Sequence, residues 1–283
     1  MRLVSFQDGA RAASGIRLGE DVVDLAPLDT TLAAVLAADA DARQQLAARA
    51  ASARRVPLAS LALLPAVPQP GKIICIGLNY ALHAKEGGNP IPDYPAIFMR
   101  GRTSLVAHAA PMWRPRASQK LDYEAELAFV VGRPARHVTE ADALAHVGAY
   151  ACFNEGSVRD FQRKSTQWTV GKNFDRTGAF GPELVTPDEL PAGASGLRIA
   201  TRLNGETMQD STTADMIFSV AKLVSILSQA MTLETGDVVA TGTPSGVGYA
   251  RTPPRFLQPG DVVEVEIEGI GVLKNPVVDE PAG

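Results

Sequence analysis

The chain has 283 residues, of which 46% are hydrophobic and 20% are charged, and its formal net charge at pH 7 is −4. This composition is typical of a globular protein with a sizeable core, and it argues against a nucleic-acid-binding protein, which normally presents a basic surface. The sequence has neither an apolar run near the roughly 20 residues of a membrane span nor the features of a signal peptide at its start, MRLVSFQDGA. Cys75 and Cys152 lie in apolar runs and are expected to be buried thiols. We therefore expect a cytoplasmic protein.

The N-terminal residues 1–64 are predicted to form a small α/β domain. Short strand patterns precede an alanine-rich stretch of helical composition (1–6, 15–19 and 21–25, then 31–53). Pro65, Pro68 and Pro70 mark residues 65–71 as a linker. A larger domain is predicted over residues 72–283.

The larger domain is predicted to be mainly β with peripheral helices. Apolar strand patterns recur along it (72–79, 95–99, 126–132, 149–153 and 237–240). Asn204-Gly205 is a strong hairpin signal within 197–209. Residues 261–271 alternate, which assigns Glu264, Glu266 and Glu268 to a solvated strand face.

Two helices are predicted between these strands. One covers 138–148, with Thr139 as its N-cap. The other covers 213–230, where apolar residues recur at helical spacing and Thr212 with Asp215 forms a capping box. The order of elements is neither a regular βαβ alternation nor an internal repeat, so an α+β, mainly β fold is expected.

Two glutamates interrupt the apolar strand pattern that follows Lys120. Glu124 and Glu126 are two residues apart, and alternate side chains of a strand point to the same face. Two like charges side by side in apolar surroundings are costly unless a proton or a cation neutralises them. The pair is therefore a candidate divalent-metal site.

Glu155 is the third acidic candidate, because it follows the apolar run 149–153 and is expected at the end of a strand. Three carboxylates would suit a hard cation such as Mg²⁺ or Mn²⁺. The sequence has no His/Cys cluster of zinc-site spacing. The alternative is that Glu155 forms an ion pair with Arg159 or Arg163 on the following turn.

His83 and Glu86 form a second candidate group within residues 77–88. They are three residues apart, so they are adjacent on one helical face, and glycines flank the segment. A carboxylate bonded to histidine orients the ring and raises its basicity, as in a general base, and the glycines would let the segment move as a lid. The alternative is an ordinary exposed helical turn.

A glycine-rich segment at 240–248 follows the predicted strand 237–240 but lacks the Gly-Lys-Ser/Thr of a nucleotide-binding loop. Its amides and hydroxyls, that of Thr243 among them, could hold a carboxylate or a phosphate. A plain tight connection is the alternative. Lys172, between a glycine and an asparagine, could stabilise an anion, or it could be an ordinary surface lysine.

Together these segments resemble the fumarylacetoacetate hydrolase family, and in particular its smaller bacterial members, of the acylpyruvate hydrolase and 2-hydroxyhepta-2,4-diene-1,7-dioate isomerase types. The resemblance covers roughly residues 72–280. It rests on six segments that occur in order: IGLNYALHAKE, DYEAELAFVVG, YACFNEGSVRDFQ, GKNFD, DMIFSVAKLVSILS and GDVVATGTPSGVG. Six such segments in sequence make a specific match.

The resemblance implies a catalytic domain folded as a mixed β-sandwich roll, a homodimer, and a divalent cation, Mg²⁺ with Mn²⁺ or Ca²⁺ as alternatives. It also assigns roles to three groups of residues: metal ligands Glu124, Glu126 and Glu155; catalytic residues His83, Glu86 and Lys172; and substrate-binding residues Arg100, Gln162, Gly242 and Thr243. His83 and Glu86 would form a water-activating dyad on a mobile lid.

The chemistry implied by the family uses a small 2-oxo acid, whose carboxylate and keto oxygens chelate the cation. The cation stabilises an enolate while a neighbouring C–C bond breaks, after His83 has activated a water that attacks the distal carbonyl. We therefore expect a hydrolase of an acylpyruvate such as fumarylpyruvate. The same enolate also supports tautomerisation or decarboxylation of a 2-oxo diacid of the carboxymethyl-hydroxymuconate or oxaloacetate type. A non-catalytic metal-binding protein is the alternative of a different class.

Two residues depart from the family pattern. Glu155 stands where aspartate is usual, and its extra methylene lengthens the third arm of the metal site by roughly one C–C bond. Arg100 stands where lysine is common. A planar guanidinium suits a carboxylate, which points to a dicarboxylic substrate.

Overall fold

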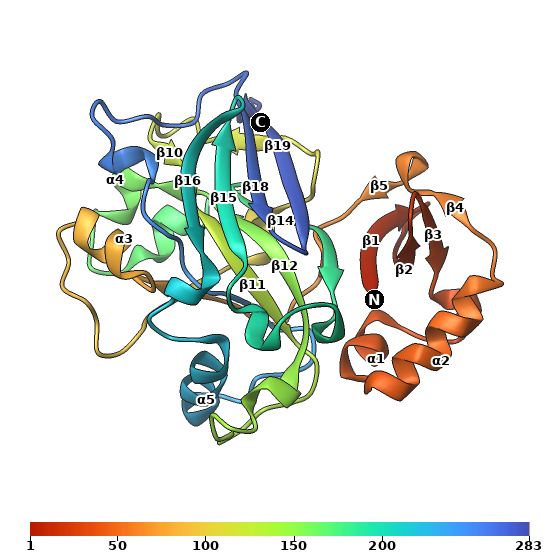
Figure 1. The fold of residues 1–283 in the computed structure, drawn as a ribbon. Helices are drawn as coiled ribbons and strands as arrows, with labels where there is room; N and C mark the ends of the chain where they lie inside the picture. Colours follow the sequence, from red (N-terminus) through yellow and green to blue (C-terminus); the bar gives the residue numbers. More distant parts are fainter. Residues whose placement is uncertain (283) are drawn as a thin grey trace.

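A twelve-stranded sheet runs through both lobes of the molecule in the computed structural model, which describes residues 1–282 (Figure 1). Along its main path the strands are β4 (Val56–Pro57), β3 (Asp21–Asp24), β2 (Arg11–Leu18), β1 (Arg2–Asp8), β14 (Gly178–Val185), β12 (Val147–Glu155), β11 (Ala125–Val131), β17 (Val238–Ala240), β6 (Ile73–Gly77) and β7 (Ala96–Arg100). Beside this path, β5 (Ala62–Leu63) pairs with β1, and β8 (Leu105–Val106) pairs with β14.

A five-stranded sheet packs against the larger lobe's part of the first one. Its order is β16 (Glu206–Thr212), β15 (Arg198–Leu203), β18 (Val262–Ile267), β19 (Gly271–Asp279) and β9 (Met112–Arg114), and β10 (Leu121–Asp122) pairs separately with β13 (Ser157–Val158). Leu127 and Phe129 of β11 share one apolar core with Val265 of β18, so the two sheets form a sandwich. The prediction of an α+β, mainly β fold is confirmed.

Strand β11 is buried on both faces, and every one of its residues is inaccessible or nearly so. Leu127 and Phe129 face the sandwich core, whereas Ala128 and Val130 belong to a second core that also contains Val35. Val35 lies on α1 (Leu32–Ala37), a helix of the smaller lobe. The acidic residues at the start of β11 therefore enter a sheet that is covered on both sides.

The small N-terminal lobe, drawn in red and orange in Figure 1, is joined to the larger lobe by strand pairing as well as by the chain. Strand β1 pairs with β14 through Arg2↔Val185 and Leu3↔Leu184. The helical stretch predicted at 31–53 is two helices, α1 and α2 (Ala40–Ala51). The break occurs because the Asp39 carboxylate caps α2 by accepting a hydrogen bond from the Ala42 amide at 2.9 Å.

The predicted hairpin at Asn204-Gly205 is confirmed, because β15 and β16 flank these two residues, whose φ angles are 53° and 85°. The helix predicted over 213–230 is too long: α5 covers Val220–Ala230, and its N-cap is Ser219. Thr212 is an N-cap, as predicted, but it caps a separate 3₁₀ turn at Thr213–Asp215, where its hydroxyl accepts from the Ala214 amide at 3.3 Å. The predicted capping box itself is not completed, because the Asp215 carboxylate accepts from the Ser211 hydroxyl at 3.2 Å. In the same turn the Thr213 hydroxyl donates to the Ala194 carbonyl.

The helix predicted over 138–148 is also wrong, because only a 3₁₀ turn at Ala143–His146 forms there. Val147 and Gly148 instead begin β12, and Val147 pairs with Val131 of β11. A Cβ on Gly148 would lie 2.8 Å from the Cα of Gly132, so the two strands approach closely where both residues are glycine. Strand pairing outweighs the local helical pattern.

Four strand ends meet at one edge of the larger sheet and carry the candidate site. Strand β11 is antiparallel to β12 and to β17, and β17 is parallel to β6. The start of β11 therefore lies beside the ends of the other three strands. The short helices α3 (Ala81–Glu86) and α4 (Arg159–Gln162) follow at this edge, and Figure 1 shows them at the end of the larger lobe that is far from the smaller one.

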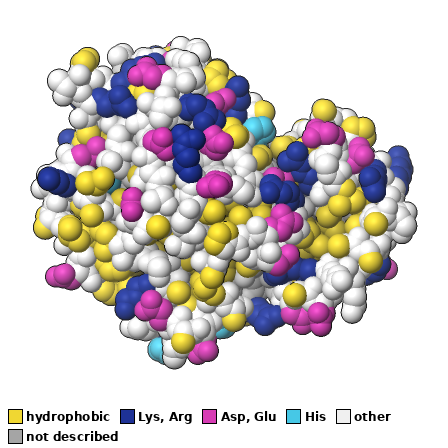
Figure 2. Space-filling model, viewed as in Figure 1, with side chains coloured by type: hydrophobic (Ala, Val, Ile, Leu, Met, Phe, Trp, Pro, Cys, Tyr) yellow, Lys and Arg dark blue, Asp and Glu magenta, His cyan; other side chains and the backbone are white. Residues whose placement is uncertain are grey.

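On the surface in view, lysine and arginine side chains are interspersed with aspartate and glutamate (Figure 2). Among residues 1–282, none of the helices has the length and apolar character required to cross a membrane.

Asn79, between β6 and α3, forms hydrogen bonds to two other segments of the chain at this edge of the sheet. We expect its replacement to destabilise the fold. Its side-chain amide donates to the carbonyls of Phe218 and Thr241 at 3.0 and 2.7 Å, and its oxygen accepts from the Phe218 amide at 2.7 Å. Asn79→Leu would leave buried polar groups unsatisfied and should lower the free energy of unfolding in urea by roughly 3 kcal/mol. The exposed Asn89→Ala should change it by less than about 0.5 kcal/mol. A loss below about 1 kcal/mol for Asn79→Leu would contradict this role.

Candidate active site

Glu124, Glu126 and Glu155 come together at the edge where the four strand ends meet. One carboxylate oxygen from each lies within 4.8 Å of the others, and all three residues are buried. The sheet register is the cause, because the Glu155 amide donates to the Glu124 carbonyl at 2.9 Å and so places the two residues opposite each other. The predicted clustering of these carboxylates therefore follows from one strand pairing.

Glu124 is surrounded by donors. Its carboxylate accepts hydrogen bonds from the Ser157 hydroxyl at 2.7 Å, from Arg159 Nη2 at 2.8 Å and from Lys172 Nζ at 2.5 Å. Burial raises the pKa of Glu124, but the positive charges of Arg159 and Lys172 outweigh burial and hold this pKa below its usual range. Glu124 is therefore ionised at neutral pH.

The surroundings of Glu126 favour its neutral form, in contrast to those of Glu124. Its carboxylate accepts a hydrogen bond from the Gly242 amide at 2.9 Å. Burial and the negative charges of Glu155 and Glu124 raise the pKa of Glu126 well above its usual value. Gly242 has a φ of 98°, and a Cβ there would lie 2.9 Å from the Ile76 carbonyl oxygen, so only glycine fits this close approach. Gly242 thus supports Glu126 and does not line the cavity.

Glu155 has one satisfied oxygen and one free oxygen. Oε2 accepts from Lys172 Nζ at 2.7 Å, whereas Oε1 is buried and has no hydrogen-bond partner among residues 1–282. Arg100 Nη1 is 3.6 Å from Oε1, beyond hydrogen-bond distance. The alternative pairing of Glu155 with Arg159 is not present, because that guanidinium binds Asp122 and Glu124.

These observations fit a hard divalent cation. The donor set consists of carboxylate oxygens, one of which is buried and unbonded within the described chain. Four buried carboxylates face three cations: Asp122, Glu124, Glu126 and Glu155 against Arg100, Arg159 and Lys172. With all four ionised the cluster would have one excess negative charge, which either a proton on Glu126 or a bound cation can neutralise. Because lone buried charges are costly, a cation at this position would stabilise the cluster.

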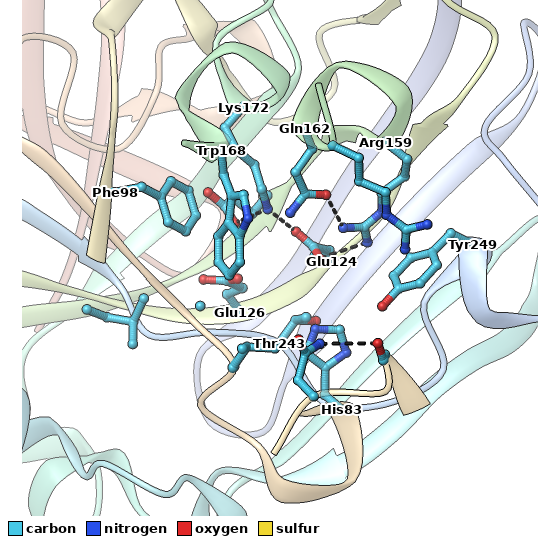
Figure 3. Close-up of a pocket in the computed structure, with 17 residues that line it drawn as sticks. His83, Phe98, Glu124, Glu126, Arg159, Gln162, Trp168, Lys172, Thr243 and Tyr249 are labelled. Atoms are coloured by element: carbon cyan, nitrogen blue, oxygen red, sulfur yellow. Dashed lines mark hydrogen bonds and ion pairs between the residues drawn. The ribbon is translucent and has the colours of Figure 1, made fainter. Parts of the chain in front are cut away.

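The carboxylates form the floor of a cavity of about 350 Å³. Figure 3 shows Lys172, Trp168 and Phe98 on one side of Glu124, Arg159 and Tyr249 on the other, and His83 and Thr243 across from Lys172. The ring of Trp168 meets Phe98 edge-on, with centroids 5.6 Å apart. The cavity thus has an apolar side and a cationic side above an acidic floor.

His83 lines this cavity and is paired with Glu86 on the same short helix, α3. The distance from His83 Nδ1 to Glu86 Oε1 is 2.9 Å, and Glu86 also accepts from the Gly246 amide at 3.0 Å. In the tautomer whose Nδ1–H donates to Glu86, Nε2 has a free lone pair that can accept a proton. His83 is only 7% exposed, so the alternative of an ordinary exposed turn does not describe it.

The predicted substrate-binding residues divide into two groups. Thr243 and Gln162 line the cavity, whereas Arg100 and Gly242 do not. The Arg100 guanidinium is buried behind Glu155, where it donates to the Ser104 hydroxyl, the Gly156 carbonyl and the Thr177 hydroxyl. This placement corrects the expectation that Arg100 holds a substrate carboxylate, because its donors are already used inside the protein.

Several cavity residues were not assigned roles from the sequence, among them Arg159, Arg163, Trp168 and Tyr249. Arg159 lies three residues before Gln162 and donates to its side chain at 2.9 Å, a helical spacing that could have identified it. Trp168 packs over Gly77, where a Cβ would lie 2.2 Å from the indole ring. The contact between these two distant residues has no local sequence signal.

Comparisons with known proteins agree with this geometry. Residues 72–278 match the family described as Fumarylacetoacetate (FAA) hydrolase C-terminal. The chain is 39% identical to oxaloacetate tautomerase fahd2, mitochondrial, of Xenopus laevis, over 98% of this chain and 90% of that protein. It is 31% identical to 5-carboxymethyl-2-hydroxymuconate delta-isomerase from Mycobacterium smegmatis, with a TM-score of 0.79 and full coverage of both chains.

A third similar structure is maleylpyruvate hydrolase from Sphingobium sp. SYK-6 in complex with manganese(II) and pyruvate. It is 27% identical to this chain, has a TM-score of 0.83, and is matched over 99% of this chain and 100% of that one. The similar proteins therefore include a tautomerase, an isomerase and a hydrolase.

Glu126→Gln provides a test of the metal site that does not depend on turnover. Because Glu126 is repelled by two neighbouring carboxylates, the variant should melt no lower than the wild type in EDTA. It should lose most of the rise in melting temperature that Mn²⁺ produces, and its affinity for Mn²⁺ in calorimetric titration should fall by roughly 100-fold. The exposed Glu206→Gln serves as the control. Equal Mn²⁺ affinity in Glu126→Gln and the wild type would exclude Glu126 as a ligand.

Proposed function

The chain belongs to the fumarylacetoacetate hydrolase family, and from this membership and its acidic cavity we propose that it tautomerises a small 2-oxo diacid of the oxaloacetate type with the help of Mg²⁺. The observation that carries the proposal is the meeting of three buried carboxylates, Lys172 and the His83–Glu86 pair in one cavity. The 39% identity to an oxaloacetate tautomerase, over nearly the whole of both chains, favours tautomerisation over other reactions of the family.

Glu124, Glu126 and Glu155 are the proposed metal ligands, and their oxygens favour Mg²⁺ or Mn²⁺, with Ca²⁺ as a further possibility. When bound there, a divalent cation would stabilise the negative charge of an enolate. Homodimer formation and a cytoplasmic location remain predictions.

Lys172 is proposed to stabilise the anionic oxygen of the substrate. Burial lowers the pKa of Lys172, but the charges of Glu124 and Glu155 outweigh burial and raise this pKa above its usual value. The ammonium group therefore stays charged at neutral pH, and it acts by electrostatic attraction and hydrogen bonding rather than as a base.

His83 is proposed to move the proton between carbon 3 of the diacid and the solvent. Glu86 holds the ring through Nδ1, so Nε2 is the nitrogen that exchanges the proton. The Thr243 hydroxyl is proposed to donate to the substrate's 2-oxo carboxylate, since Gln209 already donates to it at 2.8 Å and leaves its own proton free. Gln162, fixed by Arg159, would contact the same group.

A hydrolase that cleaves the C–C bond of an acylpyruvate is the second candidate. The specific observation in its favour is the same His83–Glu86 pair, since a buried histidine oriented by a carboxylate can activate a water. The two reactions share an enolate and differ in whether water attacks a distal carbonyl, so products distinguish them.

We expect His83→Gln to lower kcat for the enzyme's reaction by roughly 10²- to 10⁴-fold with a smaller change in KM, because a proton-transfer group is removed. Glu86→Gln should lower kcat less, since Gln can still contact the ring. His146→Gln, on a 3₁₀ turn away from the cavity, is the matched control. Turnover by His83→Gln within threefold of the wild type would remove His83 from the chemistry.

A substrate panel with Mg²⁺ or Mn²⁺ separates the two candidate reactions. Enol oxaloacetate, acetopyruvate and fumarylpyruvate are supplied, and both the enol absorbance and the release of pyruvate are followed. A tautomerase removes the oxaloacetate enol absorbance while the total amount of oxaloacetate is conserved. Release of pyruvate and a carboxylic acid from the acylpyruvates, with inactivity on oxaloacetate, would instead establish the hydrolase.

A further inference from the structure

Two arginines on one helical turn contact the same aromatic ring at the mouth of the cavity. Arg159 and Arg163 are four residues apart, and the Arg163 amide donates to the Arg159 carbonyl at 3.2 Å. Their guanidinium carbons lie 4.5 and 4.6 Å from the centre of the Tyr249 ring. Such positions are stabilised by cation–π attraction, and they keep two positive charges close together.

The two arginines differ in their partners. Arg159 forms ion pairs with Asp122 and Glu124. Arg163 also lines the cavity, but within the described chain none of the carboxylates lies within 4.0 Å of its guanidinium. Arg163 is exposed to solvent, so it is accessible to an incoming molecule. It is therefore an unneutralised positive charge that is held at a defined position.

The opposite side of the cavity is formed by the packed rings of Phe98 and Trp168 and by Lys172, whose ammonium is already paired with Glu124 and Glu155, so apart from this paired group the side is apolar. A substrate anchored over the acidic floor by its 2-oxo carboxylate has its far end near one of these two sides. If the far end of the substrate is anionic, the arginines attract it, whereas contact with the rings of Phe98 and Trp168 would remove its hydration without compensation.

We propose that Arg163, held by Tyr249, binds the second carboxylate of a 2-oxo diacid and so selects diacids over monoacids. This inference rests on the proposed 2-oxo acid function and names the group that recognises the distal end of the substrate. A guanidinium offers paired N–H donors that match a carboxylate. Tyr249 also lies against Gly87, the residue that follows α3, where a Cβ would lie 2.8 Å from the tyrosine hydroxyl.

The first test compares Arg163→Gln with the wild type on oxaloacetate and on 2-oxobutanoate, which carries a methyl group in place of the second carboxylate. Enzyme-dependent deuterium exchange at carbon 3 measures both reactions. For oxaloacetate, KM should rise by roughly 10- to 100-fold, and the loss of kcat/KM should exceed that for 2-oxobutanoate by about tenfold or more. An equal loss on the two substrates, or a loss on neither, would overturn the proposal.

Lys164→Gln is the matched control, because Lys164 is the next residue, carries the same charge and does not line the cavity. Its ammonium lies 3.5 Å from the centre of the Phe161 ring instead. The control should retain the preference for oxaloacetate. If Lys164→Gln loses the preference as much as Arg163→Gln, general attraction by surface charge explains it and Arg163 is not a specific contact.

Tyr249 variants test how Arg163 is held. Tyr249→Phe keeps an aromatic face and should retain at least half of the selectivity ratio, whereas Tyr249→Leu removes the cation–π contact and should reduce the ratio by about threefold or more. Equal selectivity in Tyr249→Leu and the wild type would show that the ring does not position Arg163.

A binding measurement separates failure of this inference from failure of the proposed function. L-Malate and 2-hydroxybutanoate are titrated calorimetrically into the Mn²⁺-loaded wild type and Arg163→Gln. The variant should bind malate roughly tenfold more weakly, with a smaller change for 2-hydroxybutanoate. That result supports Arg163 even if the wild type exchanges deuterium on neither 2-oxo acid, an outcome that would count against the tautomerase alone. Equal malate affinity in the two proteins would overturn the assignment of Arg163.

Discussion

The buried carboxylates at one sheet edge are the constraint on which the rest of the cavity depends. Three glutamates with oxygens within 4.8 Å of one another repel strongly in a site shielded from water. The surrounding cations, Lys172, Arg159 and Arg100, reduce this repulsion without cancelling it. The positive charges of Arg159 and Lys172 hold Glu124 ionised, whereas burial and the negative charges of Glu155 and Glu124 drive Glu126 toward its neutral form. A divalent cation would relieve the repulsion at Glu126, which is the physical reason that the site suits one.

Strand pairing brings these charges together and also supplies the groups around them. The strand ends that meet at this edge carry Glu155 and lead into the Thr241–Thr243 segment and the turn toward His83, so the acidic floor is built at the edge of one sheet and the candidate base lies on the short helix α3 that follows β6. Sites built on strand ends are held more precisely than sites on long loops. The short helices and loops above this floor carry Arg163, Trp168 and Tyr249. The similar proteins include a tautomerase, an isomerase and a hydrolase.

The strand alternation and the hairpin could be predicted from the sequence, because each depends only on residues that are neighbours in the chain. The alternation of a strand placed Glu124 and Glu126 on one side, and the Asn204-Gly205 pair identified a hairpin. The predicted bounds of the helices were less accurate. Thr212 is an N-cap, but only of a 3₁₀ turn at Thr213–Asp215, and α5 begins after Ser219, because the Thr213 hydroxyl is bound to a carbonyl that is distant in sequence. The pattern at 138–148 looked helical, yet Val147 pairs with Val131 of β11 and Gly148 lies at the irregularity that follows.

The sequence by itself determined the family, the mainly β class and the identity of the acidic residues, because these depend on the order of residue types and on the two-residue period of a strand. The tertiary structure alone decided where the cations point. Arg100 was expected in the pocket and lies behind Glu155, whereas Arg159, considered only as an alternative partner of Glu155, bridges Asp122 and Glu124. An arginine side chain is long and flexible, so its direction is set by the packing and the charges that the whole fold places around it.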